Sequence, residues 1–206
     1  MRQDVQTCGV RREYYNFDER YQKQMGTPSS KALPTSLPTS SPPALIEVDN
    51  DDTALGPVEK WTAHRRGTAR LHRAFSLLAF DEEGRLLMQQ RAVCKTLFPG
   101  FWANTCCSHP HHGTPEEEEA CHVGVRRAAE RRAKEELGAH VPKEYMHCAL
   151  RLLYRASYDD DWEEWELDHV LVAHVSTGLS VRLNPDEVAA VQWVTRAQFE
   201  AMTDLA

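Results

Sequence analysis

The sequence has little that would carry the protein into a membrane or onto nucleic acid. No apolar run is long enough to cross a bilayer, and the first residues, Met1-Arg2-Gln3-Asp4, lack the apolar core of a secretory signal. The formal net charge of -7 provides no global basic field for nucleic acid. We therefore expect no membrane or nucleic-acid partner and a location in the cytoplasm, which leaves a peroxisome or plastid open. An anionic ligand would need a local basic pocket.

The sequence also lacks any CxxC pair of the kind that builds zinc fingers. Of its six cysteines, Cys106 and Cys107 are adjacent and the others are scattered. This spacing favours free thiols over a disulfide framework.

The chain divides into an N-terminal tail and one folded domain. Residues 1–50 include a stretch rich in Ser, Pro and Thr, a composition that cannot bury enough apolar surface to offset its ordering entropy, so we predict a disordered tail there. Residues 51–206 are predicted to fold. Strands are expected over 72–80, 86–91, 150–158, 166–175 and 188–194, with a helix running from the N-cap Thr114 to Gly138 and a short one over 196–202. Strands and helices without regular βαβ alternation indicate the α+β class, with a mixed, largely antiparallel sheet flanked by helices.

Two pairs of reactive side chains have the spacing of an extended segment. Cys107 and His109 are two residues apart, as are Glu164 and Glu166, and side chains at i and i+2 of a strand share a face. Thiol, imidazole and carboxylates aimed at one point indicate a metal-assisted proton-transfer site. Each pair also has a plainer interpretation, as packed or solvated side chains, and Cys106 is the more natural core thiol.

Several basic residues and one acidic helix end could form an anion site. Arg91, Lys95, Lys60 and Arg132 could hold phosphate oxygens, although each taken singly is more often solvated. The helix end Glu135-Glu136-Leu137-Gly138 could hold Mg²⁺ against a diphosphate and resembles the end of a Nudix box. Arg132 stands where the Nudix hydrolases have Glu.

Seven separate motifs follow one another along the chain from about Lys60 to Met202. They are Lys60-x-x-x-His64, Leu71-His72-Arg73-Ala74-Phe75-Ser76, Gln89-Gln90-Arg91-x-x-x-Lys95 with Phe98-Pro99-Gly100, Trp102-x-Asn104-Thr105-Cys106-Cys107-Ser108-His109-Pro110, Arg131-Arg132-x-x-x-Glu136-Leu137-Gly138, Tyr154-Arg155-Ala156 and Glu164-x-Glu166. In this order they resemble one family, the type I isopentenyl-diphosphate isomerases, and the Cys-Cys-Ser-His-Pro form looks eukaryotic.

The resemblance implies a Nudix-like α/β/α fold and two metal ions. One divalent metal, which could be Zn²⁺, Mn²⁺ or Fe²⁺, would be bound by three imidazoles and two carboxylates. A Mg²⁺ ion would bridge the diphosphate to Glu136 and the backbone carbonyl of Cys107. The implied metal ligands are His64, His72, His109, Glu136, Glu164 and Glu166. The implied substrate-binding residues are Lys60, His64, Arg91, Lys95 and Arg132.

The implied reaction moves a C=C bond, converting isopentenyl diphosphate to dimethylallyl diphosphate in isoprenoid biosynthesis. Cys107 and Glu166 would be the acid and the base, in an order that the sequence leaves open, with Tyr154 hydrogen-bonded near Glu166. The expected partner is this small prenyl diphosphate, and the expected state is a monomer.

Two other functions are compatible with parts of the sequence. A Nudix-type diphosphate hydrolase would activate water, and a metal-binding module would have no catalytic activity. The second is considered because family members continue into a C-terminal segment carrying a Trp, and we expect this segment to be missing here.

Overall fold

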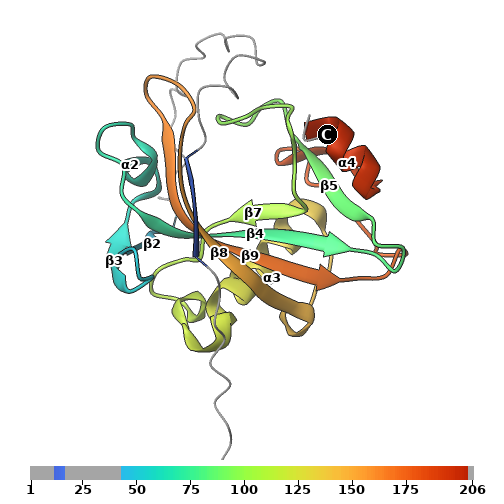
Figure 1. Cartoon of the computed structure of the whole chain (residues 1–206), viewed down its shortest axis with the longest axis horizontal. Coiled ribbons are helices and arrows are strands. Elements are labelled where there is room, and N and C mark those ends of the chain that lie inside the picture. The colour runs from blue at the N-terminus through green and yellow to red at the C-terminus, as the bar shows by residue number, and fades with distance from the viewer. Residues whose placement is uncertain (1–11, 17–42, 204–206) are drawn as a thin grey trace, which may run out of the picture.

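The structure, a computed structural model, describes residues 12–16 and 43–203. Its strands form one mixed sheet (Figure 1). They are β1 Arg12–Asn16, β2 Leu45–Val48, β3 Ala54–Val58, β4 His72–Phe80, β5 Leu86–Arg91, β6 Trp102–Ala103, β7 Cys106–Ser108, β8 Met146–Ser157, β9 Glu163–His174 and β10 Val188–Val194. The α-helices are α2 Lys60–His64, α3 Val123–Leu137 and α4 Arg196–Thr203, and the 3₁₀ helices are η1 Pro115–Glu117, η2 Ala120–His122 and η3 Lys143–Tyr145. None of the described helices has both the length and the apolar character needed to cross a membrane.

Strand β4 is the centre of the sheet. It runs parallel to β9 and antiparallel to β2, β5 and β7. Strands β8 and β9 form a long antiparallel hairpin, and β10 closes the other side on β5. The predicted class, α+β with a mixed and largely antiparallel sheet, is therefore confirmed.

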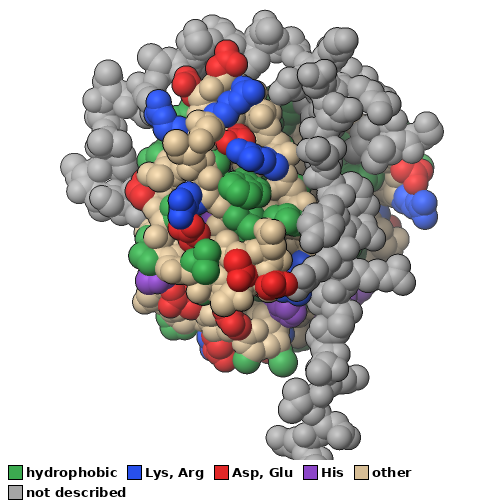
Figure 2. Space-filling model, turned by 60° about the vertical axis from the view of Figure 1, so that its left-hand side comes forward, with side chains coloured by type: hydrophobic (Ala, Val, Ile, Leu, Met, Phe, Trp, Pro, Cys, Tyr) green, Lys and Arg blue, Asp and Glu red, His purple; other side chains and the backbone are tan. Residues whose placement is uncertain are grey.

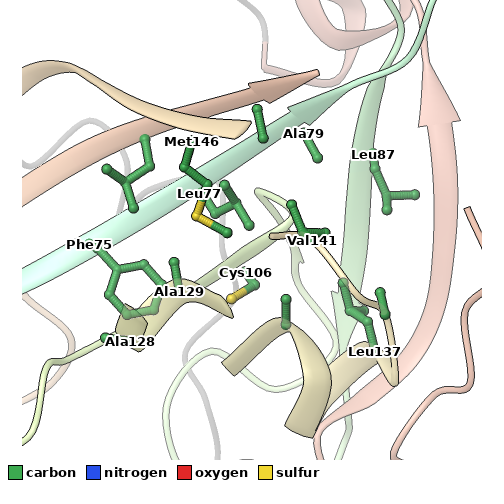
Figure 3. Packing of buried hydrophobic residues seen from close by; sticks show 14 of the residues in the cluster. Phe75, Leu77, Ala79, Leu87, Cys106, Ala128, Ala129, Leu137, Val141 and Met146 are labelled. Atoms are coloured by element: carbon green, nitrogen blue, oxygen red, sulfur yellow. The ribbon is translucent and has the colours of Figure 1, made fainter. Parts of the chain in front are cut away.

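The main core lies between this sheet and α3. Figure 3 shows Phe75 and Leu77 of β4 facing Ala128 and Ala129 of α3, with Cys106 beside them. Small residues on the helix let its backbone approach the sheet closely. The helix ends where predicted, at Gly138, whose φ of 58° gives the left-handed C-cap that glycine adopts without strain.

The β8–β9 hairpin extends past the sheet beside α2 (Figure 1). An isolated bridge between Arg65 and Trp162 joins the segment after α2 to the residue just before β9. Helix α2 itself is short and depends on its cap, because the carboxylate of Glu59 accepts hydrogen bonds from the N–H groups of Trp61 and Thr62.

The prediction of one helix from Thr114 to Gly138 was wrong over its first turns. Thr114 caps only η1, and the chain takes left-handed conformations at Cys121 and His122 before α3 begins at Val123. The reason is tertiary: Glu116 folds back so that its carboxylate, 2.6 Å from Arg131 Nε, binds the helix that follows. As a result, the glutamates at 116–119 lie before α3, whose first turn holds no acidic residue.

The predicted boundary of the tail at residue 50 also differs from the structure. Strand β2 lies before that boundary and pairs with β3 and β4, and its Ile46 is completely buried. Burial of Leu45, Ile46 and Val48 outweighs the loop-forming composition just upstream. Strand β1 also falls inside the predicted tail and runs parallel to β8. The rest of the predicted tail, residues 1–11 and 17–42, lies outside the described residues.

Candidate active site

Four side chains from four separate elements meet at one point. His64 comes from the end of α2, His72 from the start of β4, His109 from just after β7, and Glu166 from β9. One ligand atom from each lies within 4.8 Å of the other three. The parallel register pairs His72 directly with Glu166, which fixes two of the four side by side in the sheet.

The carboxylate of Glu166 is the centre of this cluster. Its Oε1 lies 2.9 Å from His109 Nε2, 3.5 Å from His72 Nε2 and 3.7 Å from His64 Nε2. The side chain of Glu166 is almost fully buried, as are those of His64 and His72. Three imidazole nitrogens converging on one buried carboxylate oxygen form the arrangement expected of a divalent-metal site.

The tautomers of two histidines fit metal binding. His64 Nδ1 donates to the backbone carbonyl of Lys60 at 2.7 Å, and His72 Nδ1 donates to that of Arg70 at 2.8 Å. Each ring therefore directs the unprotonated Nε2 into the cluster. The Nε2 of His72 is buried and has no hydrogen-bond partner, which is the state of an imidazole whose partner would be a metal ion.

The protonation states also suit a metal. Burial lowers the pKa of His109 to about 3, so the ring is neutral and can coordinate. Burial opposes ionisation of Glu166, but the hydrogen bond from His109 Nε2 at 2.9 Å helps to hold its pKa well below the usual value. The residues present therefore fit a Zn²⁺, Mn²⁺ or Fe²⁺ ion.

Tyr154 links Glu166 to the second predicted carboxylate. Its hydroxyl donates to Glu166 Oε2 at 2.6 Å and lies 3.1 Å from Glu164 Oε2. Tyr154 lies on β8, and the antiparallel register places it directly opposite Glu166 of β9. Glu164 lies at the edge of the cluster, outside the four converging atoms, and burial followed by the charge of Glu166 raises its pKa to about 7.

Cys107 lies on β7, paired with Ser76 of β4. Burial, with the nearby charge of Glu136, raises the pKa of its thiol to about 12, so the thiol holds its proton at neutral pH. Its neighbour Cys106 is fully buried in the main core, where it packs among apolar side chains (Figure 3). The sequence-based assignment of Cys106 as the core thiol is confirmed, and Cys107 is mostly buried but retains some exposed surface.

The four predicted phosphate-binding residues gather in one place. Burial lowers the pKa of the Lys60 ammonium, and the charges of Lys95, Arg132 and Arg91 lower it further. Such an effect requires the other three cations to lie within electrostatic reach of Lys60. Arg91 is oriented by two hydrogen bonds to the carbonyl of Leu97, at 2.9 and 3.2 Å.

Glu136 connects this basic pocket to the protein interior. It is 3% exposed, its Oε1 lies 2.7 Å from Arg132 Nη2, and its Oε2 accepts a hydrogen bond from Gln89 at 2.9 Å. Burial raises its pKa, and Arg132 counteracts that shift. A buried carboxylate beside phosphate-binding cations suits the Mg²⁺ role that the resemblance implies.

Comparison with known proteins shows the family of this chain. The NUDIX domain family matches residues 70–206. The chain is 40% identical over 165 residues to isopentenyl-diphosphate Delta-isomerase 1 of Bos taurus, covering 76% of this chain and 71% of that protein. This chain belongs to the isopentenyl-diphosphate isomerase family.

Other relatives of the family support the assignment. Isopentenyl-diphosphate Delta-isomerase I of Camptotheca acuminata is 38% identical over 76% of this chain and 69% of its own length. Isopentenyl-diphosphate Delta-isomerase II of Clarkia breweri has the same identity over 76% of this chain, which covers 57% of that relative. A crystal structure of a Deinococcus radiodurans protein shares the fold, with a TM-score of 0.55, 16% identity, and coverage of 79% and 89% of the two chains.

Two residues of the candidate site were given no role from the sequence. Gln89 holds Glu136, and its i, i+2 spacing from Arg91 on β5 was a signal that could have found it. Glu187 forms ion pairs with both Lys95 and Arg132. The turn sequence that precedes it contains no motif that would have indicated a functional residue. Elsewhere, Figure 2 shows basic and acidic side chains interspersed over the described part of one face.

Proposed function

We propose that this chain interconverts isopentenyl diphosphate and dimethylallyl diphosphate by adding one proton and removing another through a tertiary carbocation. The observation that carries the proposal is that Cys107 lies within electrostatic reach of two sites. One is the buried Glu166, surrounded by three imidazoles and Tyr154, and the other is the basic pocket that contains Arg91 and Glu136.

The substrate's alkene is a very weak base, so its protonation needs an acid placed on one face and a base on the other. Cys107 and Glu166 are the proposed pair. The thiol of Cys107 keeps its proton because it is buried, and Glu166 is an ionised carboxylate that accepts hydrogen bonds from Tyr154 and His109. The two groups exchange roles in the reverse direction.

Two metal ions are part of the proposal. His64, His72, His109 and Glu166, with Glu164 at the edge, would hold a Zn²⁺, Mn²⁺ or Fe²⁺ ion. Such an ion fixes its ligands and tunes the acidity of groups bound to it. Glu136 would hold the Mg²⁺ of the bound diphosphate, while Lys60, Arg91, Lys95 and Arg132 would bind the phosphate oxygens and His64 would border the substrate.

Hydrolysis of a diphosphate is the second candidate, since the Nudix fold is shared with hydrolases. The observation against it is the pairing of Arg132 with Glu136 at 2.7 Å, because a cation stands where hydrolases carry another carboxylate. We further propose that the protein acts as a cytoplasmic monomer, which light scattering of purified protein and localisation of a tagged chain would check.

Proton NMR in D₂O tests the proposal directly. Purified protein is incubated with isopentenyl diphosphate, Mg²⁺ and trace Zn²⁺ or Mn²⁺. Deuterium-labelled dimethylallyl diphosphate is the expected product. Release of phosphate or monophosphate would assign a hydrolase instead, and unchanged substrate under every metal condition would contradict catalysis by this chain.

A further inference from the structure

Glu187 holds two of the four basic side chains through a single oxygen atom. Its Oε2 lies 2.5 Å from Lys95 Nζ and 2.8 Å from Arg132 Nη2. A carboxylate oxygen between an ammonium and a guanidinium takes the position in which an anionic phosphate oxygen would be bound by the same two groups. Glu187 therefore resembles the ligand that the pocket is proposed to bind.

Charge balance explains why a carboxylate is needed there when no ligand is bound. Lys60, Arg91, Lys95 and Arg132 lie close enough for their like charges to lower the pKa of Lys60 even with Glu187 present. Two other carboxylates pair with Arg132: the exposed Glu135 at 3.2 Å, and Glu136 at 2.7 Å, which Gln89 anchors in the interior. Neither of them is paired with Lys95, so Glu187 is the carboxylate that bridges the two cations. Without Glu187, the crowded cations would repel one another more strongly.

The backbone at Glu187 is fixed, whereas its side chain lies in the half-buried pocket. The N–H of Glu187 donates to the carbonyl of Asn184, and its carbonyl accepts from the N–H of Ala92, in the loop between Arg91 and Lys95. The next residue, Val188, starts β10 opposite Arg91. A change of side-chain rotamer could therefore release both cations without moving the strand.

We propose that Glu187 is an internal counter-ion that competes with the diphosphate for Lys95 and Arg132 and is displaced when the diphosphate binds. This inference rests on the proposed function, because it takes the basic pocket as the diphosphate site. Glu187 thereby limits how tightly substrate and product diphosphates are held, and it stabilises the ligand-free protein. It is a specificity-determining residue, separate from the groups that move protons.

Calorimetry with inorganic pyrophosphate tests the proposal at fixed ionic strength, first without divalent ions and then with Mg²⁺. Glu187→Gln keeps the shape of the side chain and removes its charge, so pyrophosphate should bind about tenfold more tightly, a change of roughly 1.4 kcal/mol. Asp186→Asn makes the same change of net charge at the exposed neighbouring residue, and it should alter the affinity by no more than about twofold. In the isomerase assay, the Gln variant should lower KM more than it changes kcat.

Thermal unfolding supplies a second readout. Without ligand, Glu187→Gln should unfold at a lower temperature than the unmodified protein. Pyrophosphate should raise the Tm of the variant by more than it raises the Tm of the unmodified protein. If that variant does not fold, Glu187→Asp, whose shorter side chain cannot keep both contacts, should shift the affinity in the same direction.

Unchanged or weaker pyrophosphate binding by Glu187→Gln would overturn the counter-ion role, and weakening only in the presence of Mg²⁺ would make Glu187 a metal ligand instead. If neither the unmodified protein nor the variants bind pyrophosphate, both the assignment of the basic pocket as a diphosphate site and the counter-ion role of Glu187 are contradicted. If the unmodified protein binds pyrophosphate and isomerises its substrate, but Glu187→Gln binds pyrophosphate with unchanged affinity, the proposed function stands and the counter-ion role of Glu187 is contradicted.

Discussion

Adjacent cysteines on β7 should respond in opposite ways to the same substitution. Cys106 is fully buried among apolar residues such as Phe75 and Leu77, whereas Cys107 lies at the proposed site and retains some exposed surface. Cys106→Ser replaces a weakly polar sulfur with a hydroxyl that has only apolar side chains around it in this cluster. Burying an unpaired hydroxyl costs roughly 1–3 kcal/mol in proteins. For a domain of this size, that loss lowers Tm by roughly 2–4 °C per kcal/mol.

Cys107→Ser should leave stability nearly unchanged and remove activity. A serine hydroxyl is a far poorer proton donor than a thiol, and loss of a general acid–base group costs about 10²–10⁴-fold in rate. Urea unfolding measures the first quantity, and formation of labelled product in D₂O measures the second. Cys106→Ser should keep kcat within a few-fold at temperatures where it is folded.

The matched pair refutes the reasoning if the two substitutions behave alike. Equal losses of activity would show that Cys107 has no special chemical role. A larger loss of stability for Cys107→Ser than for Cys106→Ser would show that the burial of the two thiols is assigned the wrong way round.

Three further substitutions test the site and the fold. Glu166→Gln should weaken Zn²⁺ binding by at least about tenfold and abolish turnover, because it removes the anionic member of the four-ligand cluster; chelator competition measures this. Gly124→Ala should destabilise the protein by roughly 3 kcal/mol despite better helix propensity, because the added Cβ would lie 2.1 Å from the carbonyl oxygen of Glu116. Asp52→Asn should cost roughly 2 kcal/mol at pH 7 in urea unfolding, because it removes the charge that pairs with the buried guanidinium of Arg73 at 2.7 Å and leaves Glu119, at 3.2 Å, as the carboxylate still paired with it.

The last substitution has a pH dependence of known sign. Burial opposes ionisation of Asp52, but the hydrogen bond and charge of His169, with the charge of Arg73, lower its pKa below the usual 3.8. Its contribution to stability is therefore fully present above pH 3.8 and is lost as the pH falls through the lower, folded-state pKa. The difference between the two proteins should shrink in strong acid, and a difference that grows there would contradict this assignment.

Each substitution has a control. Glu164→Gln changes a carboxylate at the edge of the metal cluster, so equal loss of Zn²⁺ affinity would place Glu164 fully among the ligands. Gly178→Ala puts a Cβ in ordinary contact, 3.6 Å from Ser176 Oγ, and should be nearly neutral. Asp160→Asn removes a fully exposed charge and should change stability by less than about 0.5 kcal/mol.

The identity of the reactive groups could be predicted from the sequence because strand geometry is local. Alternation along an extended segment places Glu164 and Glu166 on one face, and the structure keeps them together around Tyr154. The same local rule gave the bounds of β4, β5 and β10. It could not give α2 or the meeting of His64 with His72, which depends on how separate elements pack.

The sequence failed where tertiary contacts override local preference. Thr114, Pro115 and four glutamates are typical of a helix start, yet Glu116 turns back because pairing its carboxylate with Arg131 is worth more than a continuous first turn. In the same way, the apolar Ile46 brings β2 into the sheet from a region whose composition predicts a tail.

The sequence by itself determined the chemistry available to this protein: a thiol, three imidazoles, carboxylates and cations in the order of one family. Only the tertiary structure decided which of them share one point in space. Glu187 shows the difference, because its role depends on β10 bringing it to Lys95 and Arg132, residues about 92 and 55 positions away in the chain. Contacts between residues so far apart in the chain depend on packing and charge in the folded state, so a sequence pattern over a few residues cannot predict them.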